Sequence, residues 1–214
     1  MPNWCENILN VSGNKHEITK FKELSLVKSE TSDNLNFTME LLLPTPKELL
    51  EQTSPVMWRG DALDIEGKKE FDKQIEKLSE KYGYTDWYNW RVDNWGTKWD
   101  CADSEVLDEG ENFINIFYQT AWGPNTQFIS TIAKMFPDLT FKLSFEEPGM
   151  GFCGVYEVTN DDEDFVEGEL QNRDEESGRL VEYDSEKELW MYSDTKEIIE
   201  DEDFYPEQFN QFND

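Results

Sequence analysis

Apolar and polar side chains alternate strictly in several short stretches of the chain. In residues 139–145 the odd positions are Leu or Phe and the even positions are polar, and residues 35–41 show the same order. Residues 113–122 alternate in the same way, and so do residues 5–11 apart from Ile8. A period of two is typical of a strand with one packed and one wet face, so the pattern predicts four strands.

Segments with apolar residues at helical spacing lie between these strands. Asn14 followed three residues later by Glu17 resembles a capping box, and apolar residues at helical spacing continue to Leu24. A second apolar stripe runs from Phe128 to Phe136 and ends at a proline. The order β-α-β, insertion, β-α-β predicts an α+β fold of the ferredoxin-like, split βαβ class: a four-stranded antiparallel sheet with both helices on one face.

The chain divides by composition. We expect a ferredoxin-like domain over residues 1–158, interrupted by an insertion at about 44–111 whose spacing predicts a helix over 71–82. Residues 159–214 are expected to be an acidic C-terminal extension with short strands at 180–183 and 189–192, and residues 197–214 to be partly disordered. A further short strand is expected at 155–158.

Charge restricts the partners. The formal net charge is −29, and residues 151–214 carry 22 acidic against 4 basic side chains. A long nucleic acid or an anionic membrane would be repelled by most of this surface, so neither is expected as a direct partner. The N-terminus has no signal-peptide pattern and no apolar run is long enough to cross a bilayer, which predicts a cytoplasmic protein.

Residues for catalysis or metal binding are sparse. His16 is the only histidine, and Cys5, Cys101 and Cys153 are far apart in the sequence and lack the close pairs of a structural zinc site. No nucleophile-elbow, phosphate-loop or zinc-protease motif is present. The sequence therefore predicts no cofactor and favours a protein that is not an enzyme, although an uncharacterised metal-dependent enzyme stays a further alternative.

Four motifs stand out within roughly residues 1–158. They are Met1-Pro2-Asn3-Trp4-Cys5-Glu6-Asn7, Trp90-Arg91 followed by Asn94-Trp95-Gly96-Thr97-Lys98-Trp99-Asp100, Thr120-Ala121-Trp122, and Gly151-Phe152 with Gly154. In these motifs the chain is similar to the YubB-type ferredoxin-like family of phages and plasmids, a family without an established biochemical role. The resemblance implies a product of a mobile element that acts in the cytoplasm of a host.

The tryptophan-rich segment, residues 87–100, has two interpretations. It holds four Trp in thirteen residues. It can be a packed turn around Gly96, because tryptophan rings are usually core. It can also be a pocket with aromatic walls for a nucleotide-like ligand, and Phe113 and Phe117 on the expected open sheet face favour this slightly. The candidate ligand-binding residues are Trp90, Arg91, Asn94, Trp95, Lys98, Trp99, Asp100 and Trp122.

Two functions follow as hypotheses. The first is a binding or accessory protein that acts on a host protein, through an acidic surface that imitates nucleic acid in the groove of a nucleic-acid-binding protein. The alternative is binding of a small, planar, anionic ligand by the tryptophan-rich segment. The sequence specifies no oligomeric state.

Overall fold

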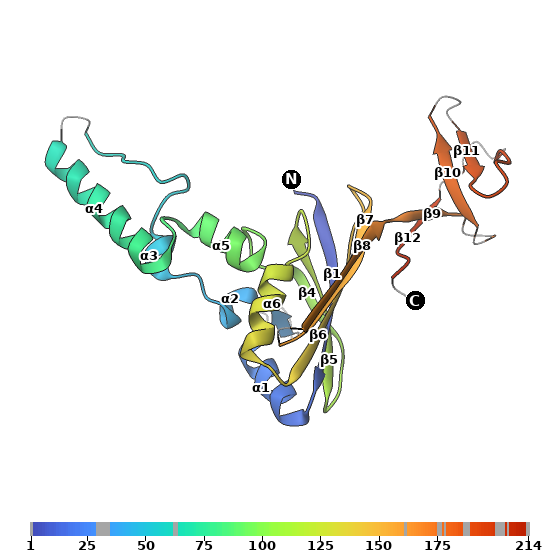
Figure 1. Cartoon of the computed structure of the whole chain (residues 1–214), viewed down its shortest axis with the longest axis horizontal. Coiled ribbons are helices and arrows are strands. Elements are labelled where there is room, and N and C mark those ends of the chain that lie inside the picture. The colour runs from blue at the N-terminus through green and yellow to red at the C-terminus, as the bar shows by residue number, and fades with distance from the viewer. Residues whose placement is uncertain are drawn as a thin grey trace.

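The computed structural model describes residues 2–28, 35–61, 64–160, 162–174, 177, 179–185, 189–199, 204 and 206–212. A six-stranded antiparallel sheet forms the centre of the molecule, a helical arm extends from one side and a small second sheet from the other (Figure 1). In spatial order the strands of the large sheet are β4 (Ala102–Glu109), β5 (Phe113–Ala121), β1 (Trp4–Gly13), β6 (Leu139–Glu147), β7 (Phe152–Thr159) and β8 (Asp162–Glu169).

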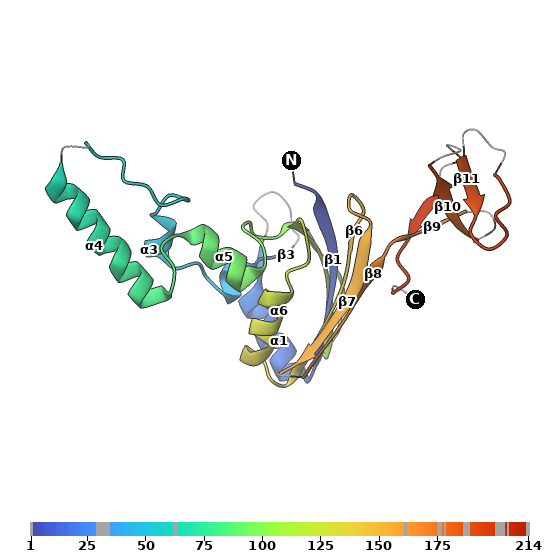
Figure 2. The same ribbon diagram turned by 45° about the horizontal axis from the view of Figure 1, so that its top comes forward.

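Two helices cover one face of this sheet, as the sequence predicts. They are α1 (Lys15–Ser25) and α6 (Thr126–Met135) (Figure 2). The Asn14 side chain accepts a hydrogen bond from the Glu17 amide at 3.0 Å, so the expected N-cap of α1 is confirmed. Apolar residues of both helices interlock with the inward positions of β1, β5 and β6, and Phe21 makes edge-to-face contacts with Phe136 and Phe141.

Four neighbouring strands, β4, β5, β1 and β6, have the order of a ferredoxin-like sheet. The first unit is β1-α1-β4, the second is β5-α6-β6, and β1 lies between β5 and β6. The expected α+β ferredoxin-like class is therefore confirmed. The open face carries Phe113 and Phe117, which are half-buried and alternate with fully buried isoleucines.

The prediction of a strand over residues 35–41 is wrong. Only β3 (Leu35–Phe37) is extended there, and it pairs with β2 (Leu26–Lys28) in a separate two-stranded sheet. The chain then turns into α2 (Met39–Leu42), because the Asp100 carboxylate accepts the backbone amides that open this helix. The second strand of the ferredoxin-like unit is instead the acidic β4, and the inserted elements lie between α1 and β4.

The insertion supplies the helical arm. It contains α3 (Lys47–Leu50), α4 (Ile65–Tyr82) and α5 (Trp87–Trp95). The expected helix over 71–82 is confirmed as the larger part of α4, which ends at Gly83 with φ 76°. α4 extends away from the sheet (Figure 1), and among its described side chains only Leu78 is buried.

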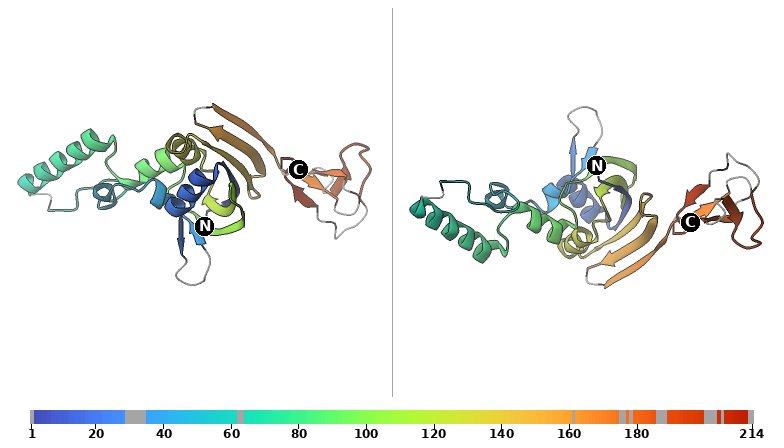
Figure 3. Two further views of the ribbon diagram at one scale, coloured as in Figure 1. Left: turned by 90° about the horizontal axis from the view of Figure 1, so that it is seen from below. Right: turned by 90° about the horizontal axis from the view of Figure 1, so that it is seen from above.

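The C-terminal part continues the large sheet before it forms its own. The β7–β8 hairpin crosses the boundary expected at residue 158, so the acidic β8 belongs to the large sheet. The expected strands at 155–158, 180–183 and 189–192 are found in β7, β10 and β11. A second sheet, in the order β11-β10-β9-β12, lies beyond the end of β8 (Figure 3); its strands are β9 (Gln171–Arg173), β10 (Leu180–Asp184), β11 (Leu189–Tyr192) and β12 (Glu207–Phe209).

The division into two domains stays a prediction. Of the end expected to be disordered, residues 200–203, 205, 213 and 214 lie outside the described residues. Within the described ranges, no helix is both long enough and apolar enough to cross a membrane.

Candidate functional site

The helix α5 and the turn after it position the tryptophan-rich segment. The Asp86 carboxylate opens α5 by accepting the amides of Tyr88 and Asn89 at 2.9 and 3.1 Å. Gly96 closes it with φ 77°, a left-handed conformation that glycine adopts without a Cβ clash. The left-handed turn at Gly96 is confirmed, whereas the helix before it was not expected.

The inward side of α5 carries two buried rings. Trp95 is fully buried, and it meets the edge of Trp90 with ring centres 6.1 Å apart. The Trp95 indole nitrogen donates a hydrogen bond to the Leu43 carbonyl at 3.0 Å. Both rings belong to the main core, so they leave no open face for a ligand.

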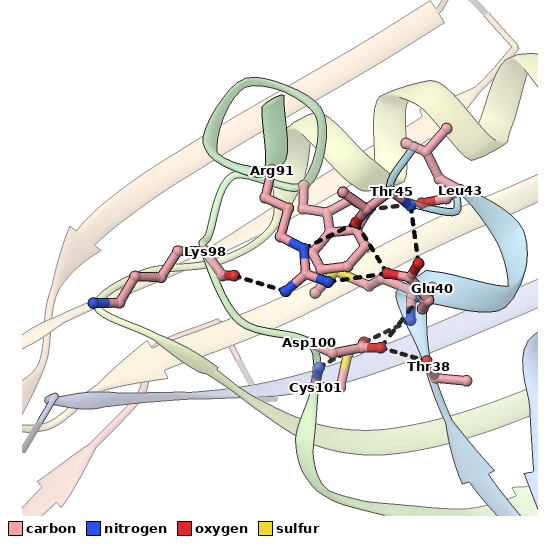
Figure 4. Close-up of polar contacts among 10 residues, drawn as sticks. Thr38, Glu40, Leu43, Thr45, Arg91, Lys98, Asp100 and Cys101 are labelled. Atoms are coloured by element: carbon pink, nitrogen blue, oxygen red, sulfur yellow. Dashed lines mark hydrogen bonds and ion pairs between the residues drawn. The ribbon is translucent and has the colours of Figure 1, made fainter. Parts of the chain in front are cut away.

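Arg91 is committed to contacts within the chain. Its guanidinium donates to Thr45 Oγ1 at 2.9 Å, to Glu40 Oε2 at 3.2 Å and to the Lys98 carbonyl at 3.3 Å (Figure 4). The same group lies over the Trp95 ring at 4.4 Å. These contacts fasten the turn after α5 to the segment around α2.

Asp100 has a similar role at the end of the turn. Its carboxylate accepts hydrogen bonds from the Thr38 hydroxyl, from the Met39 amide at 2.8 Å and from the Glu40 amide at 3.3 Å. Burial and the nearby Asp100 charge raise the pKa of the Cys101 thiol well above its usual value. Asp100 therefore holds the fold together around α2.

Asn94 also bonds within the helix. Its side-chain amide donates to the Trp90 carbonyl at 2.8 Å, which is the preceding turn of α5. The Asn94 amide group is therefore occupied by a contact within α5.

The outward side of the turn presents an aromatic stack. Trp99 and Trp122 lie face to face, with ring centres 5.2 Å apart and planes 24° apart, although they are 38% and 48% exposed. The Lys98 ammonium lies 4.2 Å from the Trp99 ring centre and 4.8 Å from that of Trp122. Trp4 of β1 extends the cluster, at 6.2 Å from Trp99.

A hollow of about 290 Å³ opens beside this stack, which we name the Lys98–Trp122 hollow. The Thr97 side chain lines it, and Thr97 Oγ1 is buried without a hydrogen-bond partner among the described residues. Trp122 has φ 69°, a left-handed conformation that is costly for a tryptophan. The lining residues are Tyr88, Val92, Gly96, Thr97, Lys98, Ala121, Trp122 and Gly123.

The structure thus separates the candidate residues into two groups. Lys98, Trp99 and Trp122 come together at the surface. The other five, Trp90, Arg91, Asn94, Trp95 and Asp100, lie in the core or fasten the turn to it. Sequence reasoning missed Thr97, Tyr88 and Trp4 as members of the surface site, although Thr97 and Trp4 stand in the motifs that carried the family resemblance.

Metal-ligand chemistry is sparse in the same part of the chain. The three cysteines are free thiols, and no group of three potential metal ligands occurs in the portion of the chain that the structure describes. Burial raises the pKa of the Cys5 thiol far above its usual value, and nearby glutamates add to the effect.

Comparison with known proteins adds the family. A family model of the ferredoxin-like domain in Api92-like protein matches residues 94–211, more than half of the chain. The chain belongs to this Api92-like family. Its matched part starts at the end of α5 and includes the turn with Thr97, Lys98 and Trp99.

The Api92-like chain also has a solved structural neighbour. The crystal structure of protein Api92 from Yersinia pseudotuberculosis aligns with 79% of this chain and 98% of its own, with a TM-score of 0.48 and 8% sequence identity. No curated protein matches the sequence.

Proposed function

We propose that this Api92-like protein is a binding protein whose Lys98–Trp122 hollow takes up a small, planar, anionic ligand. The observation that carries the proposal is the stack of Trp99 and Trp122 at the surface, with the Lys98 ammonium beside both rings. Exposed aromatic faces stack nucleobases and similar rings, at about 1–3 kcal/mol per base.

The polar groups of the hollow fit such a ligand. In the described part of the chain Lys98 Nζ forms no ion pair, so its charge is open to an incoming anion. Thr97 of the lining has a hydroxyl without a hydrogen-bond partner among the described residues. This hydroxyl is buried, so it bonds a ligand only if the side chain shifts. Lys98 is the one charged residue among those lining the hollow, so in a chain of net charge −29 it favours an anion at this place.

The size of the hollow favours a small molecule. At about 290 Å³ it is at the lower end of ligand sites and accommodates one ring with a short anionic substituent. The acidic surface around it opposes a polymer of phosphates, which supports a single nucleotide-like ligand rather than a strand.

Tryptophan fluorescence tests this proposal, because the ligand would lie on indole rings. We expect a panel of nucleotides and aromatic acids to contain at least one compound that changes the emission saturably. Lys98→Ala should weaken its binding by about 1.5–3 kcal/mol, the range for hydrogen bonds to charged groups, and change the free energy of unfolding by no more than about 0.5 kcal/mol.

Lys142→Ala is the matched control, since Lys142 is an exposed lysine of β6 on the opposite, helix-free face of the sheet. It removes the same charge and should leave binding unchanged. A flat response of the folded protein to the whole panel would refute the proposal, and so would an equal loss of affinity in both lysine variants.

A second candidate function rests on the two outer strands of the large sheet. β4 carries four acidic residues and β8 carries five, and neither carries a basic one. We infer that these edges contact a basic protein partner, in the manner of a nucleic-acid mimic. The YubB-type resemblance supports a host protein as that partner, a mobile element as the source of the chain, and the host cytoplasm as the place of action.

Capture of partners from host lysate at low and high salt tests this second candidate. Because the attraction would be electrostatic, a specific partner should bind at low salt and be released as salt is raised. A partner that stays bound at high salt, or the absence of any specific partner at low salt, would count against it.

A further inference from the structure

A second, larger hollow shares no lining residue with the Lys98–Trp122 hollow. It is a cleft of about 620 Å³ lined by residues of α5, α6, β7 and β8. The β7–β8 hairpin extends the sheet past the helices (Figure 3). We name it the α6–β8 cleft. Its lining includes Asp93, Gln127, Ser130, Tyr156, Glu163 and Phe165.

Both carboxylates of this cleft are fixed in place without a cation. The Tyr156 hydroxyl donates to Glu163 Oε2, and the Tyr84 hydroxyl hydrogen-bonds to Asp93. Burial and the bond to Glu163 raise the pKa of Tyr156 to about 12, so this hydroxyl keeps its proton and remains a donor. Among the residues that the structure describes, neither carboxylate forms an ion pair, and no lysine or arginine lines the cleft.

An open aromatic face accompanies the two charges. Phe165 is 49% exposed and stacks on Phe145, with ring centres 6.0 Å apart and planes 12° apart. The stack fixes the orientation of the Phe165 ring, whose outer side remains available. A flat ring beside carboxylates suits a guanidinium, which is planar, stacks on aromatic faces and pairs with carboxylates through two parallel hydrogen bonds.

The chain itself holds guanidinium groups in such surroundings, and Arg179 is the example at the surface of the second sheet. In the second sheet, Arg179 lies 3.7 Å from the Tyr192 ring centre and donates to Asp194 Oδ1 at 2.6 Å. The α6–β8 cleft offers the same two elements, a ring and carboxylates, with no arginine of its own.

We propose that the α6–β8 cleft binds an arginine side chain from an extended segment of a partner protein, with the guanidinium stacked on Phe165 and paired with Glu163 and Asp93. The proposal rests on the second candidate function, a basic protein partner, and gives that partner a defined anchor. Charge complementarity supports this occupant, because β8 adds four more carboxylates beside Glu163 and carries no basic residue that would compete with the arginine.

The test uses the full chain and three capped, fluorescein-labelled hexapeptides in which glycine alternates with arginine, lysine or citrulline. Citrulline keeps the shape of arginine without its charge, and lysine keeps the charge without the planar group. We expect fluorescence anisotropy to show salt-sensitive binding of the arginine peptide, several-fold weaker binding of the lysine peptide, and none of the citrulline peptide.

Three variants locate the binding. Glu163→Gln and Phe165→Leu should each lower the affinity for the arginine peptide by about fivefold to tenfold. The first removes the ion pair with Glu163 and the second removes the stacking on Phe165. Glu105→Gln on β4 is the matched control, because it removes the same charge from the opposite edge of the sheet, and it should leave affinity within about twofold. Thermal unfolding verifies that every variant is folded.

The outcomes distinguish failure of the proposed arginine site from failure of the proposed basic partner. If the arginine peptide binds but Glu163→Gln and Glu105→Gln lower its affinity equally, the α6–β8 cleft is not its binding site. That result still supports a basic partner, which a generally acidic surface attracts. If lysine binds as well as arginine, stacking on Phe165 is refuted. If no basic peptide binds at low salt, both the cleft and the basic partner are overturned.

Discussion

The two sides of the turn after α5 use the same residue types for opposite purposes. On the inner side Arg91 lies over Trp95, and each of its hydrogen-bonding nitrogens has an acceptor within the chain. On the outer side Lys98 lies over Trp99 and Trp122, and its ammonium has only the two rings among the described residues. A cation beside tryptophan is therefore available to a ligand only where its donors have no acceptor within the chain.

This contrast also explains why the segment resembles a pocket in the sequence. A binding site and a fastened turn both need flat rings, a cation and directional polar groups within a few residues. Burial decides between them, and burial depends on which side of α5 faces the core.

Replacing the buried ring should have the largest effect. Trp95→Ala removes a fully buried indole and its hydrogen bond to Leu43, so we expect a loss of about 3–5 kcal/mol in the free energy of unfolding. Urea denaturation followed by circular dichroism measures it. A loss below about 1 kcal/mol would mean that the inner side is as open as the outer one.

Arg91→Met should have the next largest effect on the free energy of unfolding. The side chain of Arg91 is mostly buried. Its loss leaves Glu40 without its cation and removes the hydrogen bonds to Thr45 Oγ1 and to the Lys98 carbonyl, which costs about 2–3 kcal/mol. The same denaturation experiment with Lys98→Met gives the matched comparison. Lys98→Met should cost no more than about 0.5 kcal/mol, because among the described residues its ammonium contacts only two ring faces and forms no hydrogen bond or ion pair.

Trp122→Gly should separate stability from binding. Glycine relieves the left-handed backbone at φ 69°, which offsets the lost stacking on Trp99, so the net change in stability should stay within about 1 kcal/mol. Ligand-induced change in fluorescence should disappear, because the outer ring of the stack is gone. Retained binding with unchanged affinity would remove Trp122 from the site.

The smallest expected effect is on the alkylation rate of the Cys101 thiol, which measures how accessible the inner side of the turn after α5 is. Its raised thiol pKa keeps the reactive thiolate scarce at pH 8, so alkylation of the native protein should be slow and should accelerate as pH rises toward the thiol pKa. In Arg91→Met the turn loosens and Cys101 should be alkylated several-fold faster. Mass spectrometry of peptides assigns the modified thiol, and Cys5, which is fully buried in β1, is the internal control.

Periodicity by itself determined most of the ferredoxin-like frame. β1, β5 and β6 alternate because one face of the sheet packs on helices and the other meets water, and this is a local signal. α1, α6 and most of α4 follow equally from helical spacing and from their caps. The acidic edge strands gave no such signal, since β4 and β8 lack an apolar face and are strands only because β5 and β7 offer them hydrogen bonds.

Tertiary structure decided what sequence alone left open. Residues 35–41 alternate as a strand would, yet Asp100, more than fifty residues away, accepts the amides of Met39 and Glu40 and turns the chain into α2. The sequence located the tryptophan-rich segment and its left-handed turn at Gly96, because glycine and clustered rings are local features. It could not assign Trp95 to the core and Trp122 to the surface, because those positions depend on how α5 packs against the rest of the fold.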